Sequence, residues 1–130
     1  MLKSLTPNLI ADNVQEAVDF YVNILGFSLT NSVPGENGLV WAQITSGNVS
    51  IMLQDRESLE AGVSALKGFP TGASGLMFVM MDNIKDFYTL VKDKVKIARP
   101  MERSFYGHDE FSIFDINGYL ITFSEEVIAQ

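Results

Sequence analysis

DNVQEAVDFY (residues 12–21) and DNIKDFYTLV (residues 82–91) are two versions of one segment, separated by 70 residues. In both, apolar residues recur three and four positions apart, which is the spacing of one face of an α-helix. Each copy opens with Asp-Asn, a pair that caps helix N-termini, and Asn13 with Glu16 forms a capping-box pattern. The repeat therefore predicts two related, capped helices. Their apolar faces carry Val14, Ala17, Val18 and Tyr21 in the first copy, and Ile84, Phe87, Tyr88 and Val91 in the second.

Strand-like segments repeat at the same interval. GNVSIMLQD (47–55) pairs with NGYLITFSE (117–125), and GLVWAQI (38–44) pairs with GHDEFSIFD (107–115) to within one residue. A repeat of this length is typical of a duplicated supersecondary unit and is too long for a solenoid. The sequence therefore predicts an α+β fold of two tandem βαβββ units.

The predicted elements place two units in a single domain, residues 1–130: a first unit at 1–55, a connector at 56–73 with a short helix, and a second unit at 74–130. The first unit has predicted strands at 4–11, 27–33, 38–46 and 48–55 and a helix at 13–25. The second has predicted strands at 74–81, 95–101, 108–115 and 118–125 and a helix at 83–93. The alternative is one ferredoxin-like sheet with an accidental repeat.

Composition excludes several classes of function. Sixteen acidic and nine basic residues give a net charge of −7, and no nucleic-acid partner is expected because phosphate contacts need clustered Lys and Arg. The absence of Cys removes disulfides and Cys-bound zinc. No signal peptide is visible, and the longest apolar run, LMFVMM (76–81), is too short to cross a bilayer. We therefore expect a cytoplasmic protein with no membrane partner.

The order of these motifs resembles a known family. PNLIADNVQEAVDFYVNILGF (7–27), YG (106–107) and EFSIFDINGYLITF (110–123) look like the vicinal oxygen chelate superfamily, which includes glyoxalase I, bleomycin-resistance proteins, fosfomycin-resistance enzymes and extradiol dioxygenases. The resemblance implies that each unit curls its sheet into a half barrel, with the helix outside and a ligand-binding cup inside. It also implies a homodimer, which agrees with the need to cover open sheet edges.

Enzymes of this superfamily hold a divalent metal on His or Glu from the first and last strand of each unit. The resemblance places those positions at Thr6, Met52, Leu76 and Thr122, and a two-residue shift would replace Thr6 by Asn8. A divalent metal needs imidazole or carboxylate donors, which these residues lack. We therefore expect neither a metal nor another cofactor.

His108 is the only histidine in the chain and the one candidate for a catalytic residue. It begins a strand-like segment after Gly107. As a general base it could work with Asp109 or Glu110, but only one of them can share its face because adjacent strand residues point to opposite sides. The other interpretations are a histidine at the rim of the cup and a pH-sensitive ligand contact.

Strand alternation predicts which residues face the cup. It groups Met52 with Gln54, Thr122 with Ser124, and Phe78 with Met80, and we expect Trp41 to be the main aromatic contact. The result is an apolar, aromatic-lined pocket with few polar groups, as is usual for a small-molecule site. The predicted ligand-binding residues are Asn8, Trp41, Gln43, Met52, Gln54, Phe78, Tyr106, His108, Phe114 and Thr122.

Three functions are compatible with these residues. The first is metal-free binding of a small molecule, flat or cationic because an indole ring and an acidic chain attract such ligands. This function resembles that of the bleomycin-resistance branch. The second is a lyase, isomerase or dioxygenase-type enzyme of the same superfamily, and the third is a domain for protein interaction.

Overall fold

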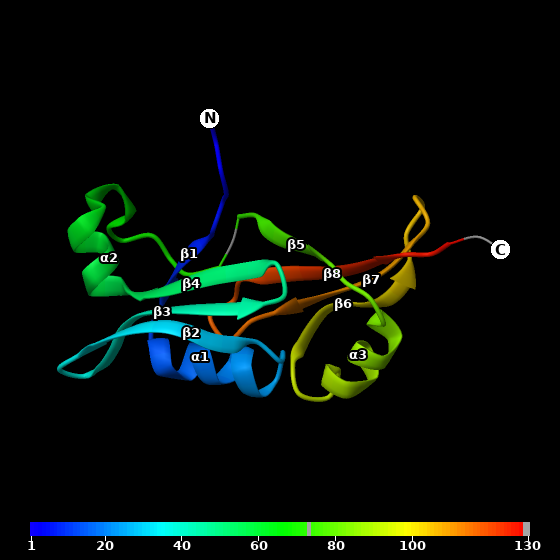
Figure 1. Ribbon diagram of the computed structural model, residues 1–130, viewed down its shortest axis with the longest axis horizontal. Helices are drawn as coiled ribbons and strands as arrows, with labels where there is room; N and C mark the ends of the chain where they lie inside the picture. Colours follow the sequence, from blue (N-terminus) through cyan, green and yellow to red (C-terminus); the bar gives the residue numbers. More distant parts are fainter. Residues whose placement is uncertain (73, 129–130) are drawn as a thin grey trace. The chain divides into compact units, whose positions relative to one another are not determined.

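The computed structural model describes residues 1–72 and 74–128, and the chain divides into two compact units after Thr71 (Figure 1). Each unit has its own four-stranded mixed sheet and its own core. The described residues thus form two sheets, one for each repeated unit, rather than the single sheet of the alternative. The α+β fold of duplicated βαβββ units is confirmed. None of the helices in the described ranges is long and apolar enough to cross a membrane.

The first unit follows the predicted order of elements. Its sheet has the strand order β1-β4-β3-β2, with β1 parallel to β4 and the other pairs antiparallel. The elements are β1 (Asn8–Ala11), α1 (Val14–Asn23), β2 (Ser28–Gly35), β3 (Gly38–Ser46), β4 (Val49–Asp55), α2 (Arg56–Gly62) and a 3-10 turn (Ser64–Leu66). The short helix predicted in the connector is therefore α2.

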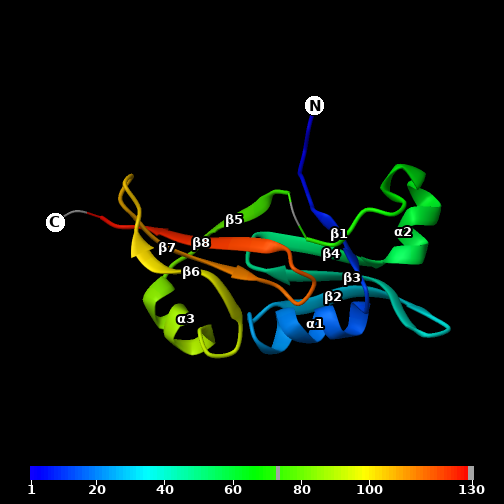
Figure 2. The same ribbon diagram turned by 180° about the vertical axis from the view of Figure 1, so that it is seen from behind.

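The second unit repeats this topology with the strand order β5-β8-β7-β6, and β5 is parallel to β8. Figure 2 shows α3 lying along one face of this sheet. The elements are β5 (Leu76–Met80), α3 (Ile84–Val91), β6 (Lys96–Arg103), β7 (His108–Phe114) and β8 (Leu120–Glu126).

The two cores are built alike, with one helix packed on one face of each sheet. Val14, Ala17, Val18 and Tyr21 of α1 are buried as predicted, together with Ala42, Ile44, Ile51 and Leu53 of the first sheet. In the second unit, the Phe87 ring lies 5.1 Å from Phe123, and the Tyr88 ring lies 4.8 Å from Phe111. A large apolar side chain that is fully buried, such as Phe111, stabilises the fold by about 1.5 to 3 kcal/mol.

The first strand begins later than predicted, at Asn8 instead of residue 4. Pro7 immediately precedes it, and its carbonyl accepts a hydrogen bond from the Met52 backbone at 2.8 Å. Proline has no N–H to donate to a β-ladder and is confined to the start or edge of strands. Thr6 consequently lies outside the sheet.

The two helices are capped differently. Asn13 caps α1, since its side chain accepts a hydrogen bond from the Glu16 backbone at 2.9 Å, as predicted. Asn83 makes no such side-chain bond and has a left-handed backbone, with φ of 59°. The Glu125 carboxylate of β8 instead accepts hydrogen bonds from Asn83 N and Ile84 N, both at 3.0 Å. The prediction of an Asp-Asn cap for the second helix is therefore wrong, because a carboxylate from a distant strand occupies that place.

We expect Glu125→Ala to lower the free energy of unfolding by about 1 to 2 kcal/mol, because it removes the α3 cap and a negative charge at the helix N-terminus. The neighbouring Glu126 is exposed, so Glu126→Ala is a matched control that should change stability by less than about 0.5 kcal/mol. Urea unfolding followed by circular dichroism measures both. Equal stability of the two variants would contradict the capping role.

Candidate functional site

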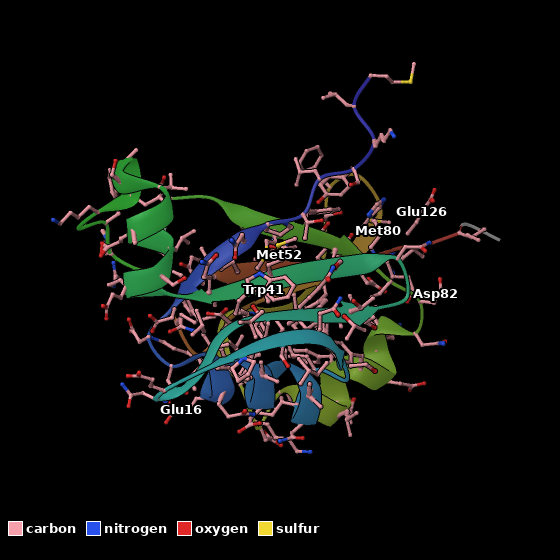
Figure 3. The ribbon with its side chains drawn as sticks, turned by 60° about the vertical axis from the view of Figure 1, so that its left-hand side comes forward. Glu16, Trp41, Met52, Met80, Asp82 and Glu126 are labelled. Carbon is pink, nitrogen blue, oxygen red and sulfur yellow. The ribbon has the colours of Figure 1, made fainter. Side chains whose placement is uncertain are left out.

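The first sheet has an open face, which we define as the side opposite α1. Ala42 and Leu53 point toward the helix and are buried, so Trp41, Gln43 and Met52 point to the open face by strand alternation. Figure 3 shows Trp41 on β3 and Met52 on the neighbouring strand β4. The open face thus carries a tryptophan among neutral side chains.

The amide side chains of this face bond to one another and to nearby hydroxyls. Asn8 donates to Gln54 Oε1 at 2.9 Å, and Gln54 donates to Ser58 Oγ at 2.8 Å. Gln43 donates to Ser50 Oγ at 2.8 Å. These bonds hold the amide groups in place, so the face is ordered around Trp41 before any ligand binds.

The second sheet carries an open pocket of about 410 Å³ on the corresponding face, which we call the second-sheet pocket. Its apolar residues come mainly from β5 and β8. Leu76 and Phe78 of β5 are 55% and 51% exposed, which is unusual for large apolar side chains at adjacent places on one strand face. The apolar lining is Leu76, Phe78, Ala98 and Leu120, and the polar lining is Arg99, Tyr106, Glu110, Ser112 and Thr122.

Glu110 is the centre of the polar lining and is only 2% exposed. Its carboxylate accepts hydrogen bonds from Arg99 Nη2 at 2.8 Å, from Ser124 Oγ at 2.9 Å and from the Tyr106 hydroxyl. Burial acts to raise the pKa of Glu110, but the hydrogen bonds from Tyr106, Arg99 and Ser124 outweigh it, so this pKa lies below its ordinary value. The bond to Glu110 raises the pKa of Tyr106. Glu110 is therefore a buried carboxylate that stays ionised.

His108 joins this network through Ser124. His108 Nδ1 lies 2.7 Å from Ser124 Oγ, which gives its only hydrogen to Glu110, so Nδ1 must be the donor. The imidazole also packs edge-on against the Tyr106 ring, with 4.9 Å between centroids. Of the two acidic neighbours considered in the sequence, Glu110 shares the face of His108, while Asp109 pairs with Arg103 at 2.7 Å.

Trp41 and Glu110 occupy equivalent places in the two units. Trp41 lies opposite Gln54 in the first sheet, as Glu110 lies opposite Ser124 in the second. Gln54 and Ser124 are 70 residues apart, but Trp41 and Glu110 are 69 apart. The two open faces have therefore diverged, one to an indole and the other to an ion pair.

The predicted ligand-binding residues fall into two groups. Asn8, Trp41, Gln43, Met52 and Gln54 share the open face of the first sheet. The others lie on the second sheet or its adjoining loop. Phe78, Tyr106 and Thr122 line the second-sheet pocket. His108 packs against the Tyr106 ring, and the Phe114 ring lies 4.9 Å from Lys96 Nζ.

Sequence reasoning did not identify Glu110, Ser112 or Arg99 as ligand-binding residues. Alternation from His108 along β7 points to Glu110 and Ser112, so a signal existed for these two. No sequence signal pointed to Arg99. Ile97 pairs with Ile113, so regular pairing would place Ala98 opposite Ser112, but a register shift in β6 places Arg99 there.

The residues that the resemblance places at the superfamily's metal positions do not fit a metal ion. Met52 and Leu76 have no hard donor, and the Thr122 hydroxyl bonds to Ser112 Oγ at 2.8 Å. Across residues 1–72 and 74–128, no three His, Asp or Glu side chains gather where they could hold a metal. No step of a metal-dependent reaction can be assigned to these residues.

Solved structures with the same fold come from several bacteria. One is TnmS3, an antibiotic binding protein from Streptomyces sp. CB03234, with 19% identity over 98% of this chain and 99% of that chain and a TM-score of 0.71. Another is TioX from Micromonospora sp. ML1, with 18% identity over 96% of this chain and 99% of that chain and a TM-score of 0.75. A glyoxalase/bleomycin resistance protein/dioxygenase from Nocardioides is also similar, with 17% identity over 100% of this chain and 87% of that chain and a TM-score of 0.79. At these identities the likeness shows the fold alone.

The sequence itself shows the family. No curated protein matches the chain. The model of the Glyoxalase/Bleomycin resistance protein/Dioxygenase superfamily, however, matches residues 4–123, nearly the whole of both units. The chain therefore belongs to the Glyoxalase/Bleomycin resistance protein/Dioxygenase superfamily.

Proposed function

We propose that the protein binds a flat small molecule on the open faces of its sheets, without a metal ion. The observation that carries this proposal is the second-sheet pocket, where an apolar wall stands beside an ordered polar cluster. Such a combination is the usual make-up of a small-molecule site. Binding of an antibiotic by TnmS3, which has the same fold, supports this class of ligand.

The apolar wall supplies the driving force. Leu76 and Phe78 of this wall are each at least 51% exposed, and Met80, the next residue on the same face of the edge strand β5, is exposed outside the pocket lining. Covering one half-exposed side chain of this size contributes roughly 1 kcal/mol. A ring laid along β5 would therefore gain from several such contacts at once.

The first sheet adds a different contact. The Trp41 ring is half-buried among neutral amides and belongs to an acidic chain. An indole face attracts flat rings and cations, and a negative field favours the cations. We propose that this face prefers flat, cationic compounds.

A second candidate function is acid–base catalysis of a lyase, isomerase or dioxygenase type. The linkage from His108 through Ser124 to Glu110 favours it, because it orients an imidazole by a buried carboxylate. Loss of a detected turnover in a folded His108→Ala variant would establish this function over simple binding.

A homodimer remains a proposal that rests on the unpaired edge strands of each sheet, β1 and β2 in the first and β5 and β6 in the second.

Leu76→Ala should weaken the binding of flat aromatic compounds about fivefold, because it removes one wall of the second-sheet pocket. Leu90 of α3 is 62% exposed and provides the matched control, since Leu90→Ala removes the same atoms outside the pocket. Isothermal titration calorimetry measures both. If the two variants bind alike, the pocket is not the site.

Flat cationic compounds should change the emission of Trp41 saturably, and Trp41→Ala should weaken their binding by roughly 1 to 2 kcal/mol. Trp41 is the only tryptophan, so its fluorescence reports on this face alone. His108→Ala should leave this affinity almost unchanged, because His108 lies on the second sheet. Emission that no compound alters would remove Trp41 from the binding surface.

Protein purified without chelators should contain well under one equivalent of Zn, Ni, Mn or Fe per chain, because the superfamily's metal positions here lack imidazole and carboxylate donors. Elemental analysis by mass spectrometry gives the content. About one equivalent of any of these metals would overturn metal-free binding and favour an enzyme.

A further inference from the structure

Arg99 forms one side of the polar floor of the second-sheet pocket. Its Nη2 donates to Glu110 at 2.8 Å, and its Nη1 lies 3.4 Å from the Glu102 carboxylate. Its Nε is buried and has no hydrogen-bond partner within residues 1–72 and 74–128. The two Nη atoms of the guanidinium thus face carboxylates, while its Nε–H group has no acceptor.

A buried N–H group without an acceptor destabilises the fold, so an acceptor is expected beside it. No oxygen of the described residues accepts a hydrogen bond from this group. An oxygen brought by a ligand would complete the hydrogen bonding of Arg99.

A second donor lies in the same pocket. Ser112 and Thr122 bond to each other at 2.8 Å, and one of the two hydroxyls must be the donor. The hydroxyl that accepts keeps its own hydrogen, and no further partner for it lies within the described part of the chain. Ser112 is the β7 residue directly opposite Arg99, and Arg99, Ser112 and Thr122 all line the second-sheet pocket.

The net charge of Arg99, Glu102 and Glu110 restricts the chemical class of the ligand. Arg99 carries one positive charge, and it is paired with two carboxylates, Glu102 and the buried Glu110. The cluster is therefore net negative. A free carboxylate would be repelled, and an ammonium group would offer no acceptor to the two donors.

We propose that the second-sheet pocket binds the neutral carbonyl oxygen of a flat apolar ligand, such as an aryl ketone or aryl amide. The oxygen accepts from Arg99 Nε and from the Ser112 and Thr122 hydroxyl pair, and the ring lies against Leu76 and Phe78. This inference rests on the proposed function and names the ligand class of that site. It differs from the cation preference of the Trp41 face.

Four naphthalenes with one variable group test the proposal: acetylnaphthalene, ethylnaphthalene, naphthoate and (aminomethyl)naphthalene. The first two differ by the carbonyl oxygen alone. Acetylnaphthalene should bind about fivefold more tightly than ethylnaphthalene, as expected for one net hydrogen bond, and more tightly than either charged compound. Calorimetry gives the affinities.

Nuclear magnetic resonance of the unaltered protein tests the contact itself. The chain has three arginines, Arg56, Arg99 and Arg103, and so gives three Nε–H signals. The Arg99 signal, identified by its loss in Arg99→Lys, should move downfield with acetylnaphthalene and not with ethylnaphthalene. The Arg56 and Arg103 signals should stay in place.

Two variants complete the experiment. Thr122→Val combined with Ser112→Ala removes both hydroxyls and should shrink the advantage of acetylnaphthalene to about twofold or less. Arg99→Lys should abolish it. Arg103→Lys is the matched control, because Arg103 lies on the same strand but pairs with Asp109, and it should keep the full advantage.

The outcomes separate this inference from the proposed function. Equal binding of acetylnaphthalene and ethylnaphthalene with no movement of the Arg99 signal would overturn the carbonyl assignment and leave the pocket as an apolar site. Tightest binding by the carboxylate or the ammonium compound would also overturn it. If none of the four compounds binds, the pocket is not a site for flat ligands, and both proposals fail there.

Discussion

Each unit depends on one constraint, the burial of a single sheet face under a single helix. Strand alternation makes one face of each sheet apolar, and α1 or α3 covers it. The duplicated topology supplies α1 to the first sheet and α3 to the second, and neither of these helices covers the opposite face. Residues on that face do not need to be apolar to pack against α1 or α3. Both candidate binding surfaces consist of such residues.

The two open faces show how far equivalent positions can diverge under this constraint. Trp41 and Glu110 lie at the same place in the repeated sheet. An indole there needs only neutral neighbours, whereas a buried carboxylate needs several donors. Arg99, Tyr106 and Ser124 provide them, and their hydrogen bonds outweigh the cost of desolvation. The ionised Glu110 is therefore the reason for the polar cluster beside the pocket.

This fold tolerates wide divergence in sequence. Chains that share 17% to 19% identity with this one superpose over most of their length. The helix faces need only apolar residues of suitable volume, so their identities can change while the fold is kept. The positions that the resemblance assigns to metal ligands hold Met52, Leu76 and Thr122 here.

The sequence by itself determined the repeat, the order of the strands and helices, and the face on which most strand residues lie, because these follow from apolar spacing along the chain. Tertiary structure decided three further points. Glu125 caps α3 from a strand 41 residues away, the β6 register shift turns Arg99 toward the pocket, and Ser124 joins His108 to Glu110. Each depends on contacts between segments distant in sequence, and local periodicity carries no information about such contacts.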